Sequence, residues 1–225
     1  MRDFTIDRRL LSAADLVRQG AVFADIGTDH AYLPIFLLSR GVIDRAVCAD
    51  INAGPLDSAR ANVKAHGFSD KVDFYLTDGA RELFDTGATD YAVCGMGGEL
   101  IARIIDDAPH LKCENVNLIL QPMSRQASLR EYLYTHGFSI DSERYSYSAG
   151  KYYVCIRATY TGECVTLSDV DYELGLKQLQ SDESYLGYLR TKYNALCRAI
   201  DGKGVENADY ELRLKQAIEE RLSEK

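Results

Sequence analysis

The sequence has 225 residues, enough for one domain of ordinary size with a small appendage, but too few for two full catalytic domains. Hydrophobic residues make up 46% and charged residues 27%, a composition that excludes a disordered or fibrous chain. The net charge of −8 excludes a protein that is basic over its whole surface, as nonspecific DNA-binding proteins are, but leaves room for local basic patches.

The chain carries no pattern typical of export, of a membrane span or of a metal site. Its first residues lack the apolar core of a signal peptide, and no stretch approaches the ~20 apolar residues of a transmembrane helix. Its six cysteines form no C-x-x-C pair, which argues against zinc and against a disulfide framework. We therefore expect a cytoplasmic protein with no metal, no DNA partner and no membrane partner.

Short apolar runs alternate with longer amphipathic segments over most of the chain. A helix over about residues 10–17 comes first, with Arg8 and Arg9 at its exposed start. The apolar runs predict five strands, at residues 22–26, 46–50, 72–76, 91–94 and 116–120. The segments between them predict helices, near residues 31–40, 55–66, 98–108 and 125–136. This order is typical of βα units around a parallel sheet, an α/β fold.

Two longer strand-like runs follow, at residues 138–147 and 152–160. The four residues between them form a short turn, so the two strands are expected to be antiparallel neighbours. Five tyrosines occur between Tyr145 and Tyr160. They offer a stacking platform for RNA, but packing across the hairpin explains them more simply, and we predict no site there.

After this hairpin the pattern becomes helical. Ser181 and the acidic residues after it predict a helix N-terminus. Apolar residues then recur every three or four positions over residues 186–200, and again over residues 210–222. Residues 201–204 interrupt the two stripes, which predict an antiparallel helical hairpin, or coiled coil. We therefore expect two domains, residues 1–164 with the sheet and residues 165–225 with the helical hairpin.

Glycine or aspartate residues lie at the ends of four of the predicted parallel strands. In chain order they are Asp25 with Gly27, Asp50, Asp78 with Gly79, and Gly95. Because the carboxyl ends of parallel strands share one edge of the sheet, these residues trace a single crevice, where doubly wound folds bind ligands. Asp29, in the first of these turns, either binds the ligand or only caps the helix that follows, and the two roles are compatible.

The charge of this crevice favours a cationic ligand over a dinucleotide. A dinucleotide site needs a glycine two positions after Gly27, but this chain has Asp29 there, followed by His30, and a further carboxylate repels pyrophosphate. Asp25, Asp29, Asp50 and Asp78 instead form an acidic rim that suits an ammonium group, ribose hydroxyls and a sulfonium. S-adenosylmethionine carries all three. The chain has no phosphate-binding G-x-x-x-x-G-K-[ST] run.

Three motifs resemble those of a known family. They are ADIGTDHAYLP at residues 24–34, CGMGG at residues 94–98 and LILQP at residues 118–122. With the start of the chain and its helical tail, they are similar to the bacterial TrmK family of tRNA (adenine-N1)-methyltransferases. The resemblance covers nearly the whole chain. It implies a class I S-adenosylmethionine-dependent fold, with a mostly parallel seven-stranded sheet and an antiparallel last strand, and methylation of nitrogen 1 of adenine 22 in tRNA.

The turn after the fourth strand agrees with attack by a ring nitrogen. Enzymes that methylate the exocyclic amino group of adenine have [DN]-P-P-[YF] here, whereas this chain has no carboxylate or amide side chain at residues 94–97. Nitrogen 1 already has a lone pair, so the enzyme needs only to align it and to tolerate a cationic product. The base must be flipped out, because nitrogen 1 lies on the Watson–Crick edge.

These arguments assign residues to three roles. We expect Asp29 to stabilise the adeninium cation or to bind the base edge, and Tyr32 to contact the flipped base, although packing in the core would also explain this tyrosine. The expected cofactor contacts are Asp25, Gly27, His30, Asp50, Ile51, Asp78, Gly79 and Gly95. The expected substrate contacts are Arg8, Arg9, Met96, Gly97, Gln121 and Pro122, and for Met96 packing within a tight turn is the alternative.

An acidic chain needs local basic patches to bind tRNA. The candidate patches are Arg8 with Arg9, Lys64 or Lys71, Arg125 with Arg130, and Lys192 with Arg198. Two alternatives stay open: a methyltransferase acting on another RNA or a small molecule, and a non-catalytic RNA-binding module with a vestigial cofactor crevice. We expect a monomer whose helical hairpin helps to grip tRNA.

Overall fold

A seven-stranded sheet forms the centre of the protein in the computed structural model, which describes residues 4–177 and 183–224. The strands, in chain order, are β1 (Val22–Ile26), β2 (Arg45–Asp50), β3 (Val72–Leu76), β4 (Asp90–Gly97), β5 (Asn117–Ser124), β6 (Phe138–Ser148) and β7 (Lys151–Tyr160). Their order in the sheet is β3-β2-β1-β4-β5-β7-β6. The first five are parallel, and β7 runs antiparallel to both of its neighbours. The predicted sheet, with its antiparallel last strand, is confirmed.

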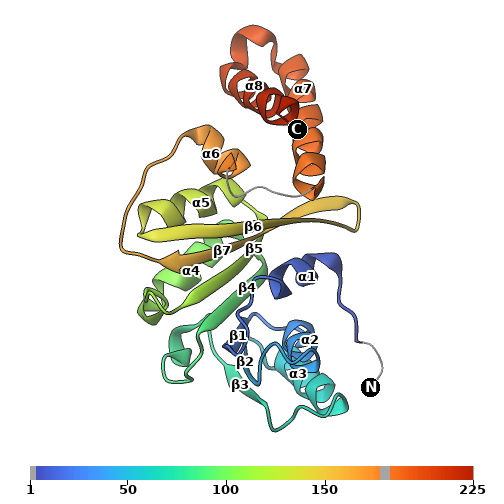
Figure 1. The fold of residues 1–225 in the computed structure, drawn as a ribbon, viewed down its shortest axis with the longest axis vertical. Coiled ribbons are helices and arrows are strands. Elements are labelled where there is room, and N and C mark those ends of the chain that lie inside the picture. Colours follow the sequence, from blue (N-terminus) through green and yellow to red (C-terminus); the bar gives the residue numbers. More distant parts are fainter. Residues whose placement is uncertain (1–3, 178–182, 225) are drawn as a thin grey trace.

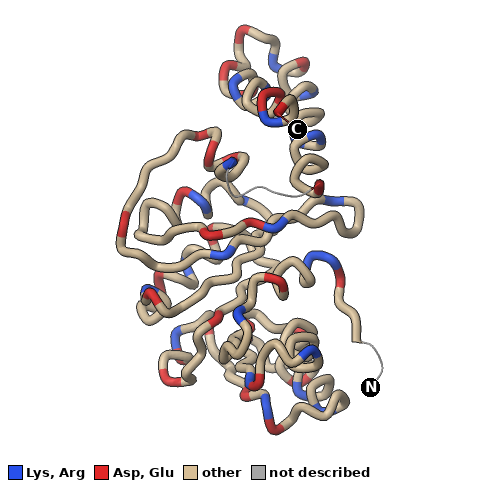
Figure 2. The backbone as a smooth tube through the Cα atoms, in the orientation of Figure 1, with Lys and Arg blue, Asp and Glu red and all other residues tan. Residues whose placement is uncertain are grey.

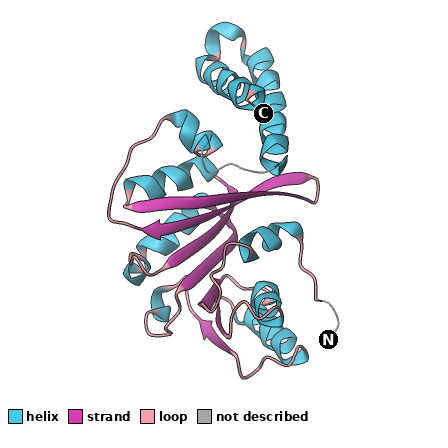
Figure 3. Ribbon diagram, in the orientation of Figure 1, coloured by secondary structure: helices cyan, strands magenta, loops and turns pink. Residues whose placement is uncertain are grey.

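Helices cover both faces of this sheet (Figure 3). The helices α1 (Arg8–Ala14), α2 (Tyr32–Ser39) and α3 (Ala53–Ala65) pack on one face. The opposite face carries α4 (Gly98–Asp106), α5 (Gln126–Thr135) and α6 (Asp169–Leu174). Successive residues of β1 face opposite layers, with Phe23 in one core and Ala24 in the other. This burial on both faces explains why the parallel strands read as unbroken apolar runs.

The strands β4 and β5 extend further than the sequence predicted. Cys94 pairs with Gln121 and Met96 with Pro122, so Gly95 is an extra residue that bulges out of the ladder. Its φ of 83° lies in the left-handed region, which glycine adopts without strain. The bulge lets the strand continue to Gly97, whereas the sequence analysis ended it at Cys94 and took the following glycines as the turn.

The C-terminal residues form the predicted antiparallel pair of helices, α7 (Glu183–Lys203) and α8 (Asp209–Ser223), which project from one edge of the sheet (Figure 1). Tyr193 donates a hydrogen bond to Glu219 and Lys203 to Glu211, so the two helices run in opposite directions. The expected break at residues 201–204 begins too early, because α7 continues through Lys203 and ends before Gly204. The predicted cap at Ser181 lies outside the described residues.

A short helix that the sequence did not predict, α6, lies between the sheet and the helical hairpin in the chain. Ser168 caps it by accepting a hydrogen bond from the amide of Asp171. Tyr172 and Leu174 of α6 are buried in the same core as Tyr185 and Leu189 of α7. The helical hairpin therefore shares apolar packing with the layer that covers the sheet. Within the described residues, no helix combines the length and the apolar character that a membrane span requires.

A buried arginine joins these layers. Arg130 of α5 is 1% exposed, forms an ion pair with Glu143 of β6 at 2.5 Å, and donates hydrogen bonds to the carbonyl of Tyr172 and the hydroxyl of Tyr145. Burial lowers the pKa of Arg130, but the neighbouring Glu143 more than offsets this and raises the pKa above its usual value, so the guanidinium is charged. The expectation that Arg130 belongs to a basic patch for tRNA is therefore wrong, because its guanidinium is buried and paired with Glu143.

Candidate active site

Two adjoining cavities lie at the carboxyl ends of the parallel strands. Cavity 1, of about 280 Å³, is lined by Asp7, Arg9, Leu10, Asp25, Gly27, Thr28, Asp29, His30, Ala31, Tyr32, Leu33, Cys94 and Gly95. Cavity 2, of about 150 Å³, is lined by Ile26, Gly27, Asp50, Ile51, Thr77, Asp78, Gly79, Met96, Leu100, Arg103 and Ile104. The structure thus brings both expected catalytic residues and all eight expected cofactor residues to this edge of the sheet.

Gly27 lines both cavities and lies in the turn between β1 and α2. Its amide donates a hydrogen bond to the carbonyl of Ala49, and its φ of 75° is in the left-handed region. A Cβ atom at this position would come within 2.1 Å of the Met96 Cε. The absence of a side chain at Gly27 therefore makes room for the Met96 side chain, which packs against this turn where the two cavities adjoin.

Asp25 is the buried carboxylate of cavity 1. Burial raises its pKa to about 6, with the Thr28 side chain lowering the pKa and the nearby charge of Asp50 contributing to the rise. Beside it, the hydroxyl of Thr28 is buried and has no hydrogen-bond partner among the described residues. A ligand with a cationic, hydrogen-bonding group would favour the ionised form of the buried Asp25 carboxylate. It would also give the buried Thr28 hydroxyl a hydrogen-bond partner.

Asp29, His30 and Tyr32 lie at the mouth of cavity 1. The Asp29 carboxylate is 74% exposed and 3.3 Å from the His30 Nε2. The rings of His30 and Tyr32 are stacked, with centroids 5.1 Å apart. Tyr32 is 44% exposed, so the alternative of a core tyrosine is wrong. The geometry leaves an aromatic surface and a carboxylate open to a base that enters the cavity.

The suggestion that Asp29 caps the following helix is also wrong. The N-cap of α2 is Ala31, whose φ of 55° places a non-glycine residue in the left-handed region. Such a conformation costs on the order of 1 kcal/mol and is common at functional sites. It turns the chain so that Asp29 and His30 face the cavity before the helix begins.

Cavity 2 combines an apolar wall with two rim carboxylates. Asp50, half-buried, accepts a hydrogen bond from the amide of Asn52, which fixes its side chain at the end of β2. Ile51 is 61% exposed and offers an apolar surface next to it, and Asp78 with Gly79 completes the rim. Carboxylates beside an apolar wall suit the hydroxyls of a ribose and the face of a purine.

The expected substrate residues do not all reach the cavities. Gln121 is fully buried and lines neither cavity, but it contacts two residues that line cavity 1. Its Oε1 accepts hydrogen bonds from Arg9 Nη1 at 2.7 Å and from the Gly95 amide at 3.2 Å. Pro122 is buried as well, and Gly97 lies against Ser124. Arg9 is thus turned inward to line cavity 1, whereas Arg8 stays exposed at the start of α1.

Sequence reasoning missed several residues that line the cavities. Thr28 was passed over because a threonine in a turn carries no signal until its burial is known. Arg103 is exposed at the edge of cavity 2, one helical turn beyond the start of α4, and was not singled out. Leu10 was expected only as a helix residue, but α1 packs so that it lines cavity 1.

Two of the other predicted basic patches contain both paired and exposed charges. Arg125 is 68% exposed, and its Nε lies 3.5 Å from Glu99. Lys192 forms an ion pair with Glu173, whereas Arg198 is exposed. Figure 2 shows the positions of Lys and Arg interspersed with those of Asp and Glu along the helical hairpin.

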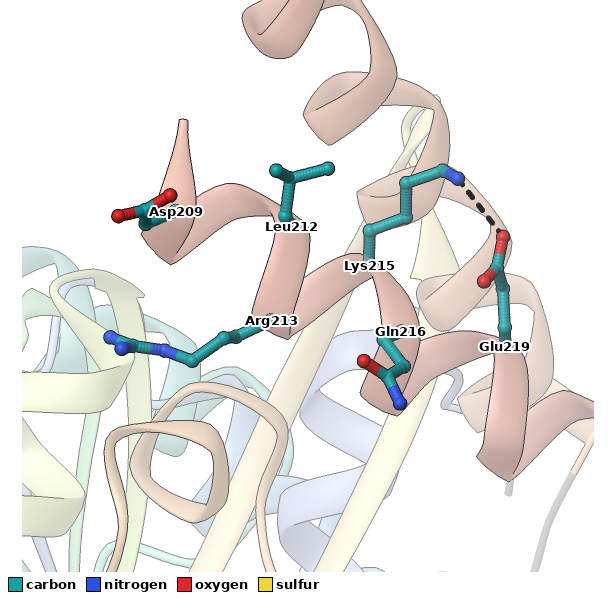
Figure 4. A pocket seen from close by; sticks show the side chains of 6 residues that line it. All are labelled: Asp209, Leu212, Arg213, Lys215, Gln216 and Glu219. Carbon is teal, nitrogen blue, oxygen red and sulfur yellow. Dashed lines mark ion pairs between the residues drawn. The ribbon is translucent and has the colours of Figure 1, made fainter. Parts of the chain in front are cut away.

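An open hollow on α8 is unrelated to the crevice. Its wall consists of Asp209, Leu212, Arg213, Lys215, Gln216 and Glu219 (Figure 4). Lys215 and Glu219 pair with each other at 3.1 Å, an ordinary surface contact between residues one helical turn apart. We assign no function to this hollow.

Comparison with known proteins agrees with this geometry. A family model described as a methyltransferase domain matches residues 6–156. A tRNA (adenine(22)-N(1))-methyltransferase of Bacillus subtilis is 32% identical over 153 residues, which are 68% of this chain and 64% of that protein, slightly less than two thirds of its length.

Solved structures share the fold over nearly the full chain. A Streptococcus pneumoniae protein, a candidate tRNA (m1A22) methyltransferase in complex with S-adenosyl-L-methionine, is 35% identical with a TM-score of 0.84, covering 97% of this chain and 100% of that one. TrmK of M. capricolum in complex with S-adenosyl-homocysteine is 26% identical with a TM-score of 0.77, covering 97% of this chain and 96% of that one.

Proposed function

The chain belongs to the TrmK family of methyltransferases, and we propose that it uses S-adenosylmethionine to methylate nitrogen 1 of an adenine in tRNA, at position 22. The observation that carries this proposal is the pair of cavities that adjoin at Gly27, with Asp25 in one and Asp50 in the other, and with the exposed Tyr32 ring beside them. We place the enzyme in the cytoplasm as a monomer, with residues 1–164 as catalytic domain and residues 165–225 as a helical domain that helps to hold tRNA.

The residues present fit the cofactor. The buried Thr28 hydroxyl, which has no hydrogen-bond partner among the described residues, and the buried Asp25 carboxylate both favour a cationic, hydrogen-bonding ligand. Asp50 would hold the ribose hydroxyls, Ile51 and Gly79 the purine, and Asp25 the ammonium group. When bound, the cofactor would supply an electrophilic methyl group for the lone pair of adenine nitrogen 1, and its sulfonium would leave as the neutral thioether of S-adenosylhomocysteine.

The chain's own residues then have two tasks. His30 and Tyr32 offer a stacked surface that holds the flipped base in the plane needed for attack. The base becomes cationic without losing a proton to the enzyme, so the site needs negative charge rather than a general base. Asp29, at the same mouth, supplies that charge.

Transfer of labelled methyl groups tests the proposal. Unmodified tRNA with adenine at position 22 is expected to be labelled, and a transcript that differs only by guanine at that position is expected to stay unlabelled. Equal labelling of both transcripts, or labelling of neither, would contradict it. Calorimetry with S-adenosylmethionine alone distinguishes a vestigial crevice, which should give no specific heat.

Affinity for S-adenosylmethionine is expected to fall about tenfold between pH 7.5 and pH 5. The pKa of Asp25 is raised to about 6, so at pH 5 only about a tenth of the free enzyme has the ionised carboxylate that attracts the cationic ligand. Calorimetry across this range measures the change, and Asp25→Asn should bind more weakly but without this pH dependence. A wild-type affinity that does not change over the range would refute the role of Asp25.

The free protein should show the opposite trend in stability. The folded state holds the Asp25 proton more tightly than the unfolded chain does, so the free energy of unfolding decreases as pH rises from about 4 to about 6. In Asp25→Asn this contribution is absent. Comparing the two proteins by urea unfolding at several pH values therefore provides an independent control for the binding result.

Charge reversals at Arg8 and Arg9 are expected to have different effects. Arg8→Glu should weaken tRNA binding and reduce its salt dependence while leaving cofactor affinity unchanged, because Arg8 is exposed. Arg9→Glu should also weaken cofactor binding, because it removes the hydrogen bond that Arg9 donates to Gln121 Oε1, the atom that also accepts from the amide of Gly95 in cavity 1. Filter binding over a salt series and calorimetry separate the two outcomes. Identical behaviour of the two variants would show that the contact with Gln121 has no role.

A further inference from the structure

A third cavity lies between the tip of the β6–β7 hairpin and α7. It has a volume of about 640 Å³, and we call it the hairpin groove; its lining residues are Gln126, Tyr147, Gly150, Lys151, Tyr152, Tyr188, Thr191, Lys192 and Ala195. In Figure 1 the hairpin turn lies below the first turn of α7. Tyr152 approaches α7 so closely that a Cβ on Gly187 would lie 2.1 Å from its hydroxyl, so the hairpin packs directly against α7 beside the groove.

The side chains of the groove are aromatic and basic. Tyr147 and Tyr152 pair across the two strands with centroids 4.8 Å apart, as the sequence predicted, yet Tyr147 remains 47% exposed. Lys151 is exposed and makes no ion pair within the described part of the chain, whereas Lys192 is held by Glu173. The lining contains no carboxylate. An exposed ring beside an uncompensated ammonium group is complementary to a nucleobase and its phosphate.

The groove is on the same side of the sheet edge as the crevice. Ile156 of β7 pairs with Leu120 in an antiparallel register, so the first residues of β7 and the hairpin turn lie at the carboxyl end of β5. Gln126, which lines the groove, donates a hydrogen bond to the carbonyl of Pro122 at 3.5 Å, and Pro122 pairs with Met96 of cavity 2. A few residues at the end of β5 therefore connect the groove to the candidate active site.

We propose that the hairpin groove binds an unpaired nucleotide of the tRNA near the target adenine, with the ring of Tyr147 stacked on its base and the ammonium group of Lys151 on its phosphate. This inference rests on the proposed function. A base that must leave its helix disrupts the stacking of its neighbours, and a second aromatic surface close to the crevice gives a displaced neighbour a place to stack. The helical hairpin then contributes one wall of a substrate site.

Substitutions at the tip of the hairpin test this inference. Tyr147→Ala should raise the KM for tRNA about tenfold, with kcat and the Kd for S-adenosylmethionine within about twofold of wild type, because one stacking contact is lost. Tyr147→Phe should resemble wild type, since the ring remains. Lys151→Ala should lower the slope of log affinity against log salt by about one, as expected for one phosphate contact. Phe84→Ala is the matched control, because Phe84 is 69% exposed but does not line the groove.

Direct binding separates failure of this inference from failure of the proposed function. If wild type labels tRNA but Tyr147→Ala has an unchanged KM and tRNA affinity, the groove is not an RNA site. If wild type labels no tRNA, the proposed function fails, and filter binding of tRNA to wild type and Tyr147→Ala still decides the groove. A Tyr147→Ala variant that changes oligomeric state but not tRNA affinity would show a protein contact and overturn the inference.

Discussion

Asp29→Ala is expected to lower the turnover number for tRNA methylation about 100-fold at saturating tRNA and cofactor. Methylation of nitrogen 1 leaves the adenine with a positive charge, and the Asp29 carboxylate lies at the mouth of cavity 1 beside the stacked His30 and Tyr32 rings. Preorganised charge of this kind typically contributes about two to three orders of magnitude to a rate. Single-turnover kinetics measure the effect on the chemical step.

Two further variants define the role of Asp29. Asp29→Asn keeps the hydrogen-bonding shape but not the charge, so a loss similar to that of Asp29→Ala would show that charge is what matters. Asp57→Ala removes an exposed carboxylate of α3 that lines neither cavity, and it should leave turnover unchanged. Wild-type turnover in Asp29→Ala would exclude a catalytic role for this carboxylate.

Arg130→Met is expected to lower the free energy of unfolding by about 3–5 kcal/mol. The variant leaves the Glu143 carboxylate in the interior without its cation, and it removes hydrogen bonds to α6 and to Tyr145. Unfolding in urea, followed by circular dichroism, measures the loss. Because Arg130 joins α5, β6 and α6, we also expect the helical hairpin to become more sensitive to proteolysis.

The same substitution at Arg125 is the matched control. Arg125 precedes α5, is 68% exposed and pairs with Glu99 only at the surface, so Arg125→Met should cost less than about 1 kcal/mol. Equal stability of Arg130→Met and wild type would mean that the buried ion pair does not hold these layers together. In the double variant Arg130→Met with Glu143→Gln, part of the stability should return, since the unpaired charge is gone.

The sheet and the crevice could be predicted because their signals are local. Each parallel strand is an apolar run, and topology alone brings the strand ends together, so Asp25, Asp50 and Asp78 could be placed at one edge without any knowledge of packing. The short turn at Gly150 likewise fixed the antiparallel hairpin.

Residues whose role depends on distant partners were predicted less well. Arg9 looked like one half of an exposed basic pair, but its partner Gln121 is 112 positions away and turns it inward. In the sequence, Arg130 looks like an ordinary surface residue of a helix. In the fold, its guanidinium is buried and donates hydrogen bonds to Glu143 and to the carbonyl of Tyr172. A sequence shows how many charges a chain has, but only the fold shows which of them are neutralised inside.

Nucleoside analysis of the product tests the central claim most directly. Unmodified tRNA is incubated with the enzyme and labelled S-adenosylmethionine, digested to nucleosides and separated under conditions that prevent rearrangement of methylated adenosines. The site described here, with an acidic mouth and no side-chain acceptor for an exocyclic amine at residues 94–97, predicts 1-methyladenosine as the labelled product. Label found only in 6-methyladenosine, or in no adenosine at all, would contradict it.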